Sequence, residues 1–253
     1  MKQTKGIVLR RVKTTGARQI LSIFTREYGK VSAGAYASSG AKNKSTAWAE
    51  PFTMGEYHLS ERGAHYNVDK AETIRVFYDI GGDLDRFFAA SYVLEITDRL
   101  LVERMPQPEL FDILADFLEA VEKRKTKFDT LVIAYECKAL AMSGALADLS
   151  ECVMCGRTDQ LTAFSVPGGG MICSDCEDKL TQEGSDSLIF HTNFDIISTI
   201  KFLVDKPLRS LQGLALDESA ATVLQRVIRE YMAYHLDISG LKSESMFSGG
   251  SGI

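Results

Sequence analysis

Cys152-Val-Met-Cys155 is followed, after seventeen intervening residues, by Cys173-Ser-Asp-Cys176. Each CxxC turn directs two sulfur atoms toward one point, and two such turns that face each other complete a tetrahedron. This spacing is typical of a structural zinc site with four thiolate ligands. Because four thiolates leave no open coordination position, the predicted metal stabilises the fold and takes no part in catalysis. The alternative interpretations are disulfides or two redox-active CxxC pairs.

The composition of the chain is that of an ordinary soluble globular protein. Its 253 residues are 45% hydrophobic and 25% charged, which suits one large domain or two smaller ones with an insertion. No apolar run reaches the roughly 18–20 residues that a membrane-spanning helix needs. The first residues, 1–6, precede a strand-like stretch and not the apolar core of a signal peptide. We therefore expect a cytoplasmic protein with reduced thiols. The fifth cysteine, Cys137, is expected on a helix, with its side chain packed in the hydrophobic core.

Charge is distributed unevenly along the chain. Residues 1–80 contain 13 Lys and Arg against 7 Asp and Glu, whereas the remaining residues contain 16 against 27. A basic first third on an acidic body indicates a localised surface that binds anions. The alternative is an accidental difference between two domains.

Residues 1–80 have the pattern of a small β-barrel. Short apolar and β-branched runs separated by turn residues predict five strands, at 6–13, 19–25, 30–36, 50–57 and 66–72. Gly29 is the expected residue with positive φ in the second turn. In the fourth strand, Phe52, Met54 and Glu56 alternate against Thr53. Five short strands in this length favour a closed barrel of the OB type.

After Gly81-Gly82 the apolar period changes from 2 to about 3.6. Asp83 is a suitable N-cap for a first helix, and Pro108 suits the first turn of a second. Further helices are expected at 128–146, 193–204 and 217–236. The predicted fold is therefore an α+β multidomain protein: an OB-type nucleic-acid-binding domain at 1–80 and a helical domain at 81–242. A four-cysteine zinc module at 150–178 interrupts the helical domain, and a Ser/Gly-rich flexible tail follows at 243–253.

The sequence contains no motif that would assemble an enzyme active site. It has no GxxxxGK[ST] phosphate loop, no HExxH motif and no GxSxG nucleophile elbow. The four histidines are scattered, and no pair of them has the spacing of metal ligands. We therefore do not expect an enzyme.

The basic residues of the predicted barrel are the candidates for binding nucleic acid. They are Arg10, Arg11, Lys13, Arg18, Arg26, Lys30, Lys42 and Lys44. Cations along an OB barrel neutralise phosphates, and exposed aromatic rings stack on bases. Tyr28, Tyr36 and Trp48 are the aromatic candidates. Since neighbouring strand residues point to opposite faces, Arg10 and Arg11 cannot lie on the same face of their strand.

Three stretches resemble the RecO family of DNA repair proteins. They are Gly6-Ile-Val-Leu-Arg-Arg11, the segment 21–30, and the run from Tyr135 through Cys152-Val-Met-Cys-Gly156 to Cys173. The likeness spans residues 4–242. One departure is the segment 35–42, Ala-Tyr-Ala-Ser-Ser-Gly-Ala-Lys, which carries fewer cations than the Lys-Gly-Ala-Arg-like run usual in that family.

The resemblance implies a recombination mediator and not a catalyst. It implies binding to single- and double-stranded DNA, annealing of complementary strands and contact with single-strand-binding protein. With RecR, such a protein would assist RecA, an indirect partner, to load onto coated strands. It would work in the cytoplasm, in association with the nucleoid and without a membrane, and a structural zinc ion would brace the helical domain.

Two alternatives from other classes remain open. One is an RNA-binding or translation-associated OB-fold protein with a structural zinc ribbon, because barrel charge does not distinguish DNA from RNA. The other is a zinc-braced scaffold without a nucleic-acid role.

Overall fold

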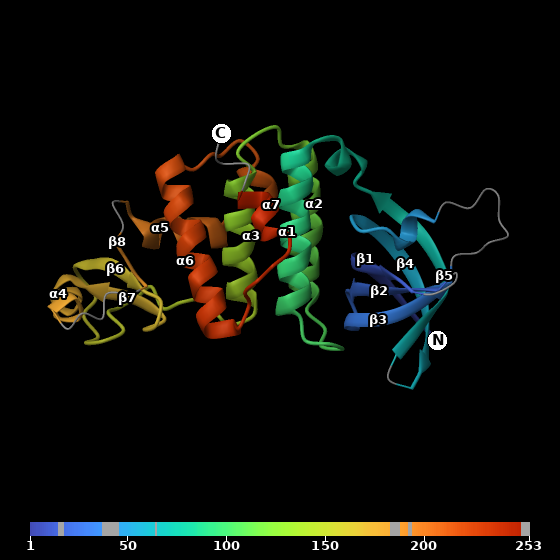
Figure 1. Ribbon diagram of the computed structural model, residues 1–253, viewed down its shortest axis with the longest axis horizontal. Helices are drawn as coiled ribbons and strands as arrows, with labels where there is room; N and C mark the ends of the chain where they lie inside the picture. The colour runs from blue at the N-terminus through green and yellow to red at the C-terminus, as the bar shows by residue number, and fades with distance from the viewer. Residues whose placement is uncertain (15–17, 37–45, 64, 183–187, 192–193, 249–253) are drawn as a thin grey trace. The chain divides into compact units, whose positions relative to one another are not determined.

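The computed structural model describes all residues except 15–17, 37–45, 64, 183–187, 192–193 and 249–253 (Figure 1). The chain divides into two compact units. Unit 1 consists of Met1–Phe128 and Leu241–Ile253, and unit 2 consists of Asp129–Gly240.

Unit 1 begins with a closed five-stranded barrel. Its strands are β1 (Lys2–Lys13), β2 (Arg18–Thr25), β3 (Gly29–Tyr36), β4 (Thr53–Arg62) and β5 (His65–Val76). They are hydrogen-bonded in the order β1-β2-β3-β5-β4, and β1 closes the barrel by pairing with β4. Only the β3–β5 pair among these is parallel. The predicted OB-type barrel is confirmed.

The barrel interior is filled by alternate side chains of the strands. In β4 the buried residues are Thr53, Gly55, Tyr57 and Leu59, so Thr53 faces the core and Met54 does not. The predicted alternation of side chains in this strand is confirmed. The face that carries Phe52 and Met54, however, is not the face that points into the barrel core. The Tyr57 ring occupies that space, and its hydroxyl donates to the backbone oxygen of Trp48 at 2.6 Å.

Three helices complete unit 1. They are α1 (Leu84–Leu100), α2 (Pro108–Lys123) and the short α7 (Glu244–Ser248), with the 3₁₀ turns η1 (Ala47–Ala49) and η2 (Tyr78–Gly82). α2 and α7 both pack against α1, and α1 packs against β1 (Figure 1). As predicted, the Asp83 side chain caps α1 by accepting from the N–H of Arg86, and Pro108 opens α2.

The buried surface of α1 is wider than a single helical stripe. Tyr92 and Ile96 are buried, but Leu84 and Phe87 are exposed. Ala89 and Val93 are buried in addition. Because α1 contacts the barrel, α2 and α7, it buries more than one stripe, and a single 3.6-residue stripe does not describe it.

The chain end also differs from the expected irregular tail at 243–253. Residues Glu244–Ser248 form α7, and the Phe247 ring stacks on Tyr92 with a centroid distance of 5.4 Å. The Glu95 side chain accepts from the N–H groups of Lys242 and Ser243 and from the Ser243 hydroxyl. The last five residues lie outside the described part of the chain.

Unit 2 combines helices with a small sheet. Its elements are α3 (Phe128–Met142), β6 (Leu161–Ser165), β7 (Gly170–Cys173), α4 (Ser174–Gln182), β8 (Ile189–His191), α5 (Ile196–Asp205), η3 (Leu208–Leu211) and α6 (Glu218–Leu236). The sheet has the order β7-β6-β8. β8 was not predicted. The sheet packs on α6, because Phe164 meets Tyr231 edge to face and His235 hydrogen-bonds to the backbone oxygen of Val166 at 2.6 Å. Cys137, on α3, is buried as predicted.

None of the described helices combines the length and apolar composition that a bilayer-spanning segment requires.

Candidate metal centre and nucleic-acid interface

The four predicted metal-ligating cysteines come together in unit 2. Their Sγ atoms all lie within 4.8 Å of one another, and those of Cys155 and Cys173 are 3.7 Å apart. A tetrahedron with metal–sulfur bonds of about 2.3 Å has edges of about 3.8 Å. The separation of the sulfur atoms therefore fits a four-coordinate metal ion.

Strand pairing and a tight turn position these thiols. The N–H of Gly156 donates to the backbone oxygen of Cys152 at 2.8 Å, and Gly156 has a φ of 73°, which a residue with a side chain adopts at a cost. Opposite it, the β6–β7 register places Leu161 beside Cys173. Cys176 follows in the first turn of α4. The hairpin thus brings the second CxxC turn against the first.

The environment changes the acidity of two of the thiols. Burial would raise the pKa of Cys152, but backbone N–H groups, among them those of Cys173 and Met154, lower this pKa to about 6. Burial raises the pKa of Cys176 to about 12, helped by hydrogen bonds from neighbouring cysteines. Of these two thiols, Cys152 therefore ionises the more readily. A bound cation would supply the charge needed to ionise the remaining thiols.

The cysteine cluster is largely enclosed by the protein. Cys152, Cys173 and Cys176 are buried, and only Cys155 is exposed. Elsewhere in the described part of the chain, no group of three or more His, Cys, Asp or Glu side chains gathers its ligand atoms in this way. With four protein ligands, a bound metal would have no free position for water or substrate.

The predicted DNA-binding cations lie on or beside the first three strands. Arg10, Arg11 and Lys13 are on β1, Arg18 opens β2, and Arg26 and Lys30 flank the β2–β3 turn. Lys42 and Lys44 lie outside the described residues. The described cations do not form one free patch, because four of the six face a carboxylate of unit 1.

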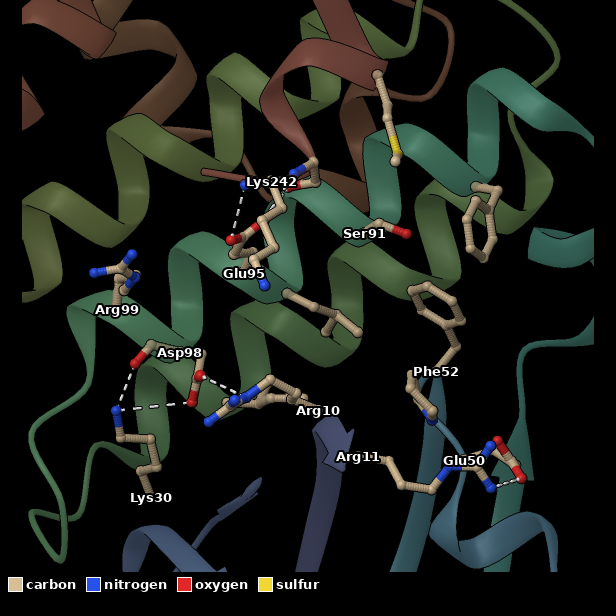
Figure 2. Close-up of a pocket in the computed structure, with 16 residues that line it drawn as sticks. Arg10, Arg11, Lys30, Glu50, Phe52, Ser91, Glu95, Asp98, Arg99 and Lys242 are labelled. Atoms are coloured by element: carbon tan, nitrogen blue, oxygen red, sulfur yellow. Dashed lines mark hydrogen bonds and ion pairs between the residues drawn. The ribbon is translucent and has the colours of Figure 1, made fainter. Parts of the chain in front are cut away.

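Asp98 on α1 is the centre of the first group of pairs. Its carboxylate lies 3.6 Å from Arg10 Nε and 3.7 Å from Lys30 Nζ, and it accepts from the Ser22 hydroxyl at 2.7 Å. Figure 2 shows Arg10 and Lys30 approaching Asp98 from the barrel side. Arg10 remains 66% exposed in spite of this contact.

The other two pairs join separate parts of unit 1. Arg11 donates to Glu50, and Arg26 makes a two-pronged contact with Asp112 on α2 at 2.9 and 3.0 Å. The contact with Asp112 raises the pKa of Arg26. Exposed pairs of this kind contribute about 0–1 kcal/mol, so a phosphate can replace the carboxylate at small cost.

Lys13 and Arg18 are different. Both are exposed, and within the described residues neither makes an ion pair with a carboxylate. Arg18 pairs in register with Tyr36, whose side chain is 65% exposed. Of the three aromatic candidates only Tyr36 is free to stack, because Tyr28 and Trp48 pack against the barrel core. The outer face at this end of the β1–β2–β3 surface thus offers Arg18 and one ring. Lys13, in register with the buried Gln19, projects to the other face of the sheet.

A second feature of unit 1 is a cavity of about 1030 Å³ between the barrel and α1, which we call the barrel–α1 cleft (Figure 2). Arg10 and Arg11 both border it, although they turn toward different carboxylates. The consecutive arginines thus share a cavity without sharing a strand face. Arg99 and Phe52 also line the cleft. No sequence signal marked these two as functional, since the cleft forms only when α1 packs on the barrel.

Comparisons with known proteins agree with this architecture. The model of the family "Recombination protein O N terminal" matches residues 1–77, and that of "Recombination protein O C terminal" matches residues 81–245. A DNA repair protein RecO from Alkaliphilus metalliredigens is 29% identical over 93% of this chain and 94% of its own length. Similar proteins of that name come from Caldanaerobacter subterraneus, at 27% over 93% of both chains, and Listeria monocytogenes, at 25% over 97% of this chain and 92% of its own. The chain therefore belongs to the RecO family of DNA repair proteins.

Proposed function

We propose that this protein is a recombination mediator that binds single- and double-stranded DNA and anneals complementary strands. With RecR it would assist RecA to load onto strands coated by single-strand-binding protein, in the cytoplasm and in association with the nucleoid. In this proposal the OB-type domain at 1–80 binds DNA and the helical domain at 81–242 contacts the protein partners. The module at 150–178 stabilises the helical domain. No catalytic step is required.

The observation that carries DNA binding is the exposed end of the β1–β2–β3 surface. Arg18 presents an unpaired charge beside the exposed ring of Tyr36, and Lys13 adds an unpaired charge at the end of the neighbouring strand β1, on the other face of the sheet. This combination suits single strands, because cations bind phosphates and a ring stacks on any base. Arg10, only loosely held by Asp98, extends the cationic surface along β1.

Salt dependence tests this assignment. In the double variant Lys13→Gln and Arg18→Gln, we expect weaker binding to single-stranded DNA at low salt. The slope of log affinity against log salt should become less negative by about 1.4, because each phosphate contact contributes about 0.7 on single strands. Lys125→Gln, which removes an exposed charge from the segment between α2 and α3, is the matched control and should leave the slope unchanged. Equal slopes for the double variant and the control would contradict the assignment, and preference for a matched RNA strand would favour the RNA-binding alternative.

The Asp98 carboxylate competes with DNA for two cations in this proposal. Asp98→Asn keeps the size of the side chain and an acceptor for Ser22 but removes the charge near Arg10 and Lys30. We expect affinity for single-stranded DNA to rise about 2- to 5-fold at low salt, since an ion pair of an exposed side chain such as Arg10 contributes up to about 1 kcal/mol. Fluorescence anisotropy with a labelled oligonucleotide measures this. Asp159→Asn, next to Arg157 in unit 2, is the control of equal charge. An unchanged or lower affinity of Asp98→Asn would show that these cations do not contact DNA.

We also propose that the metal is one structural Zn²⁺ per chain, bound by Cys152, Cys155, Cys173 and Cys176. The clustered sulfur atoms support a thiophilic metal, and zinc is the usual ion in closed four-thiolate sites.

A further inference from the structure

We propose that the barrel–α1 cleft receives one unstacked nucleotide of a single DNA strand. The base would lie against Phe52 and Phe87, and its phosphate would lie at the cationic rim near Arg10 and Lys242. This inference rests on the proposed DNA binding and adds to it a site that distinguishes single strands from duplex.

The cleft has an aromatic wall from two different elements. Phe52 precedes β4 and Phe87 lies on α1, and their rings meet edge to face with a centroid distance of 5.6 Å. In this arrangement the edge of one ring meets the face of the other, so not every ring face is covered. Phe87 is 38% exposed, and both residues line the cleft. Phe52 is half-buried, so the pair presents a partly exposed aromatic surface on which a base can stack.

The backbone of Phe52 is unusual. Its φ is 60°, in the left-handed region that bulky residues rarely adopt. The conformation is held in place because the N–H of Phe77 donates to the backbone oxygen of Phe52 at 3.1 Å. Backbone strain of this kind gathers at ligand-binding sites, where it fixes the direction of a side chain. In this protein the strained residue is Phe52 itself, whose ring lines the cleft opposite α1.

The rim of the cleft has a surplus of positive charge. Its carboxylates are already engaged: Glu50 with Arg11, Asp98 with Arg10 and Lys30, and Glu95 with two backbone N–H groups and a hydroxyl. Hydrogen bonds from Ser243 and Lys242 outweigh the effect of burial and lower the pKa of Glu95, so it stays ionised and fixed.

Two further cations, Arg99 and Lys242, line the cleft. Both are exposed. Among the described residues Lys242 makes no ion pair with a carboxylate, and Arg99 acts on Glu95 through its charge alone, which helps to lower the pKa of Glu95. Together with the partly exposed Arg10 they surround the mouth of the cleft, where they complement a phosphate.

The cleft is large enough for a base with its sugar. Its volume of about 1030 Å³ lies just above the range of about 300–1,000 Å³ found for small-ligand sites. A base in a duplex is stacked on both sides and paired along its edge, so it cannot present its face to Phe52 without leaving the helix. A single strand meets no such barrier, and the cleft therefore selects it.

The test replaces each ring in turn. Phe52→Asn removes the ring with a residue that tolerates positive φ, and Phe87→Leu keeps an apolar helix former. We expect each variant to bind single-stranded DNA about 10-fold more weakly and duplex within about 2-fold of the unchanged protein. A 2-aminopurine base in the strand should change its fluorescence on binding the unchanged protein and not on binding the variants. Tyr78→Leu, an exposed ring that does not line the cleft, is the control and should behave as the unchanged protein does.

The outcomes separate this inference from the broader proposal. If the unchanged protein binds DNA but both ring variants bind single strands equally well, the cleft is not a nucleotide site, although DNA binding stands. Equal losses for single strand and duplex would reduce the cleft to a general phosphate-binding surface and overturn base insertion. If no DNA binds at any salt concentration, the proposed function itself fails. Should Phe52→Asn unfold, Ser91→Trp, which fills the cleft from α1, gives the same test.

Discussion

Cys173→Ser should lose the metal and unfold much of unit 2. The serine hydroxyl stays protonated near neutral pH and cannot replace a thiolate ligand. The buried Cys173 ends β7, so its loss affects both the sheet and the α4 turn that carries Cys176. We expect less than half an equivalent of zinc per chain, against one for the unchanged protein. The free energy of unfolding of unit 2 should fall by about 4 kcal/mol or more, a size typical of the loss of a structural metal.

Elemental analysis and denaturant unfolding measure the two effects. Met154→Ser is the matched control, because Met154 lies inside the first CxxC turn with an exposed side chain and offers no ligand in this site. It should keep the metal. Zinc affinity of the unchanged protein should also rise with pH, since the high pKa of Cys176 means that the metal displaces a proton. Unchanged stability in metal-free Cys173→Ser would show that the metal is not structural.

The cysteine centre could be predicted from the sequence because its ligands are local. Each CxxC pair is a single turn, and the second turn needs only one hairpin, β6–β7, to meet the first. The same holds for Gly29, with its observed φ of 69°, and for the Asp83 cap of α1. In each case (a metal ligand, a residue with positive φ, a helix cap) the local structure depends on a few neighbouring residues, so the residue type is enough to predict it.

The charge pairs could not be predicted in this way. Arg10 meets Asp98 and Arg26 meets Asp112 because α1 and α2 pack on the barrel, and nothing in the local sequence specifies these partners. Counting cations along the first strands therefore overestimates the free positive charge. The barrel–α1 cleft was missed for the same reason, since Phe52 and Arg99 have meaning only after the two elements come together.

The pairs also change how the DNA-binding surface should be understood. Lys13 and Arg18 can bind phosphate at once, whereas Arg10 and Lys30 must first leave Asp98. Because a carboxylate on α1 holds cations of β1 and β3, the helix influences what the barrel offers to DNA. In the proposed function the position of α1 on the barrel would therefore affect DNA binding as well as stability. The loop after α1 contacts the barrel, because the N–H of Arg104 donates to the backbone oxygen of Lys30.

Gly29→Ala should strongly destabilise unit 1. Gly29 has a φ of 69°, and a Cβ added there would lie 2.2 Å from the backbone oxygen of Met105 in the loop between α1 and α2. Backbone atoms cannot yield as a flexible side chain does, so this loop must move. That movement breaks the hydrogen bond from the N–H of Arg104 to the backbone oxygen of Lys30, now 2.9 Å long. Strain at positive φ and overpacking each cost about 1–3 kcal/mol, so we expect a loss of about 3–5 kcal/mol.

Gly63→Ala separates these two contributions. Gly63 has a similar φ of 60° in the β4–β5 turn, but an added Cβ would meet no atom within 4 Å. We therefore expect it to cost only about 1 kcal/mol, from backbone strain alone. Trp48, the single tryptophan, packs against the barrel core and reports the unfolding of unit 1 by its fluorescence. A loss in Gly29→Ala no larger than in Gly63→Ala would mean that the loop adapts freely. In that case its contact with the barrel does not fix α1, and the helix would not control the cations that face DNA.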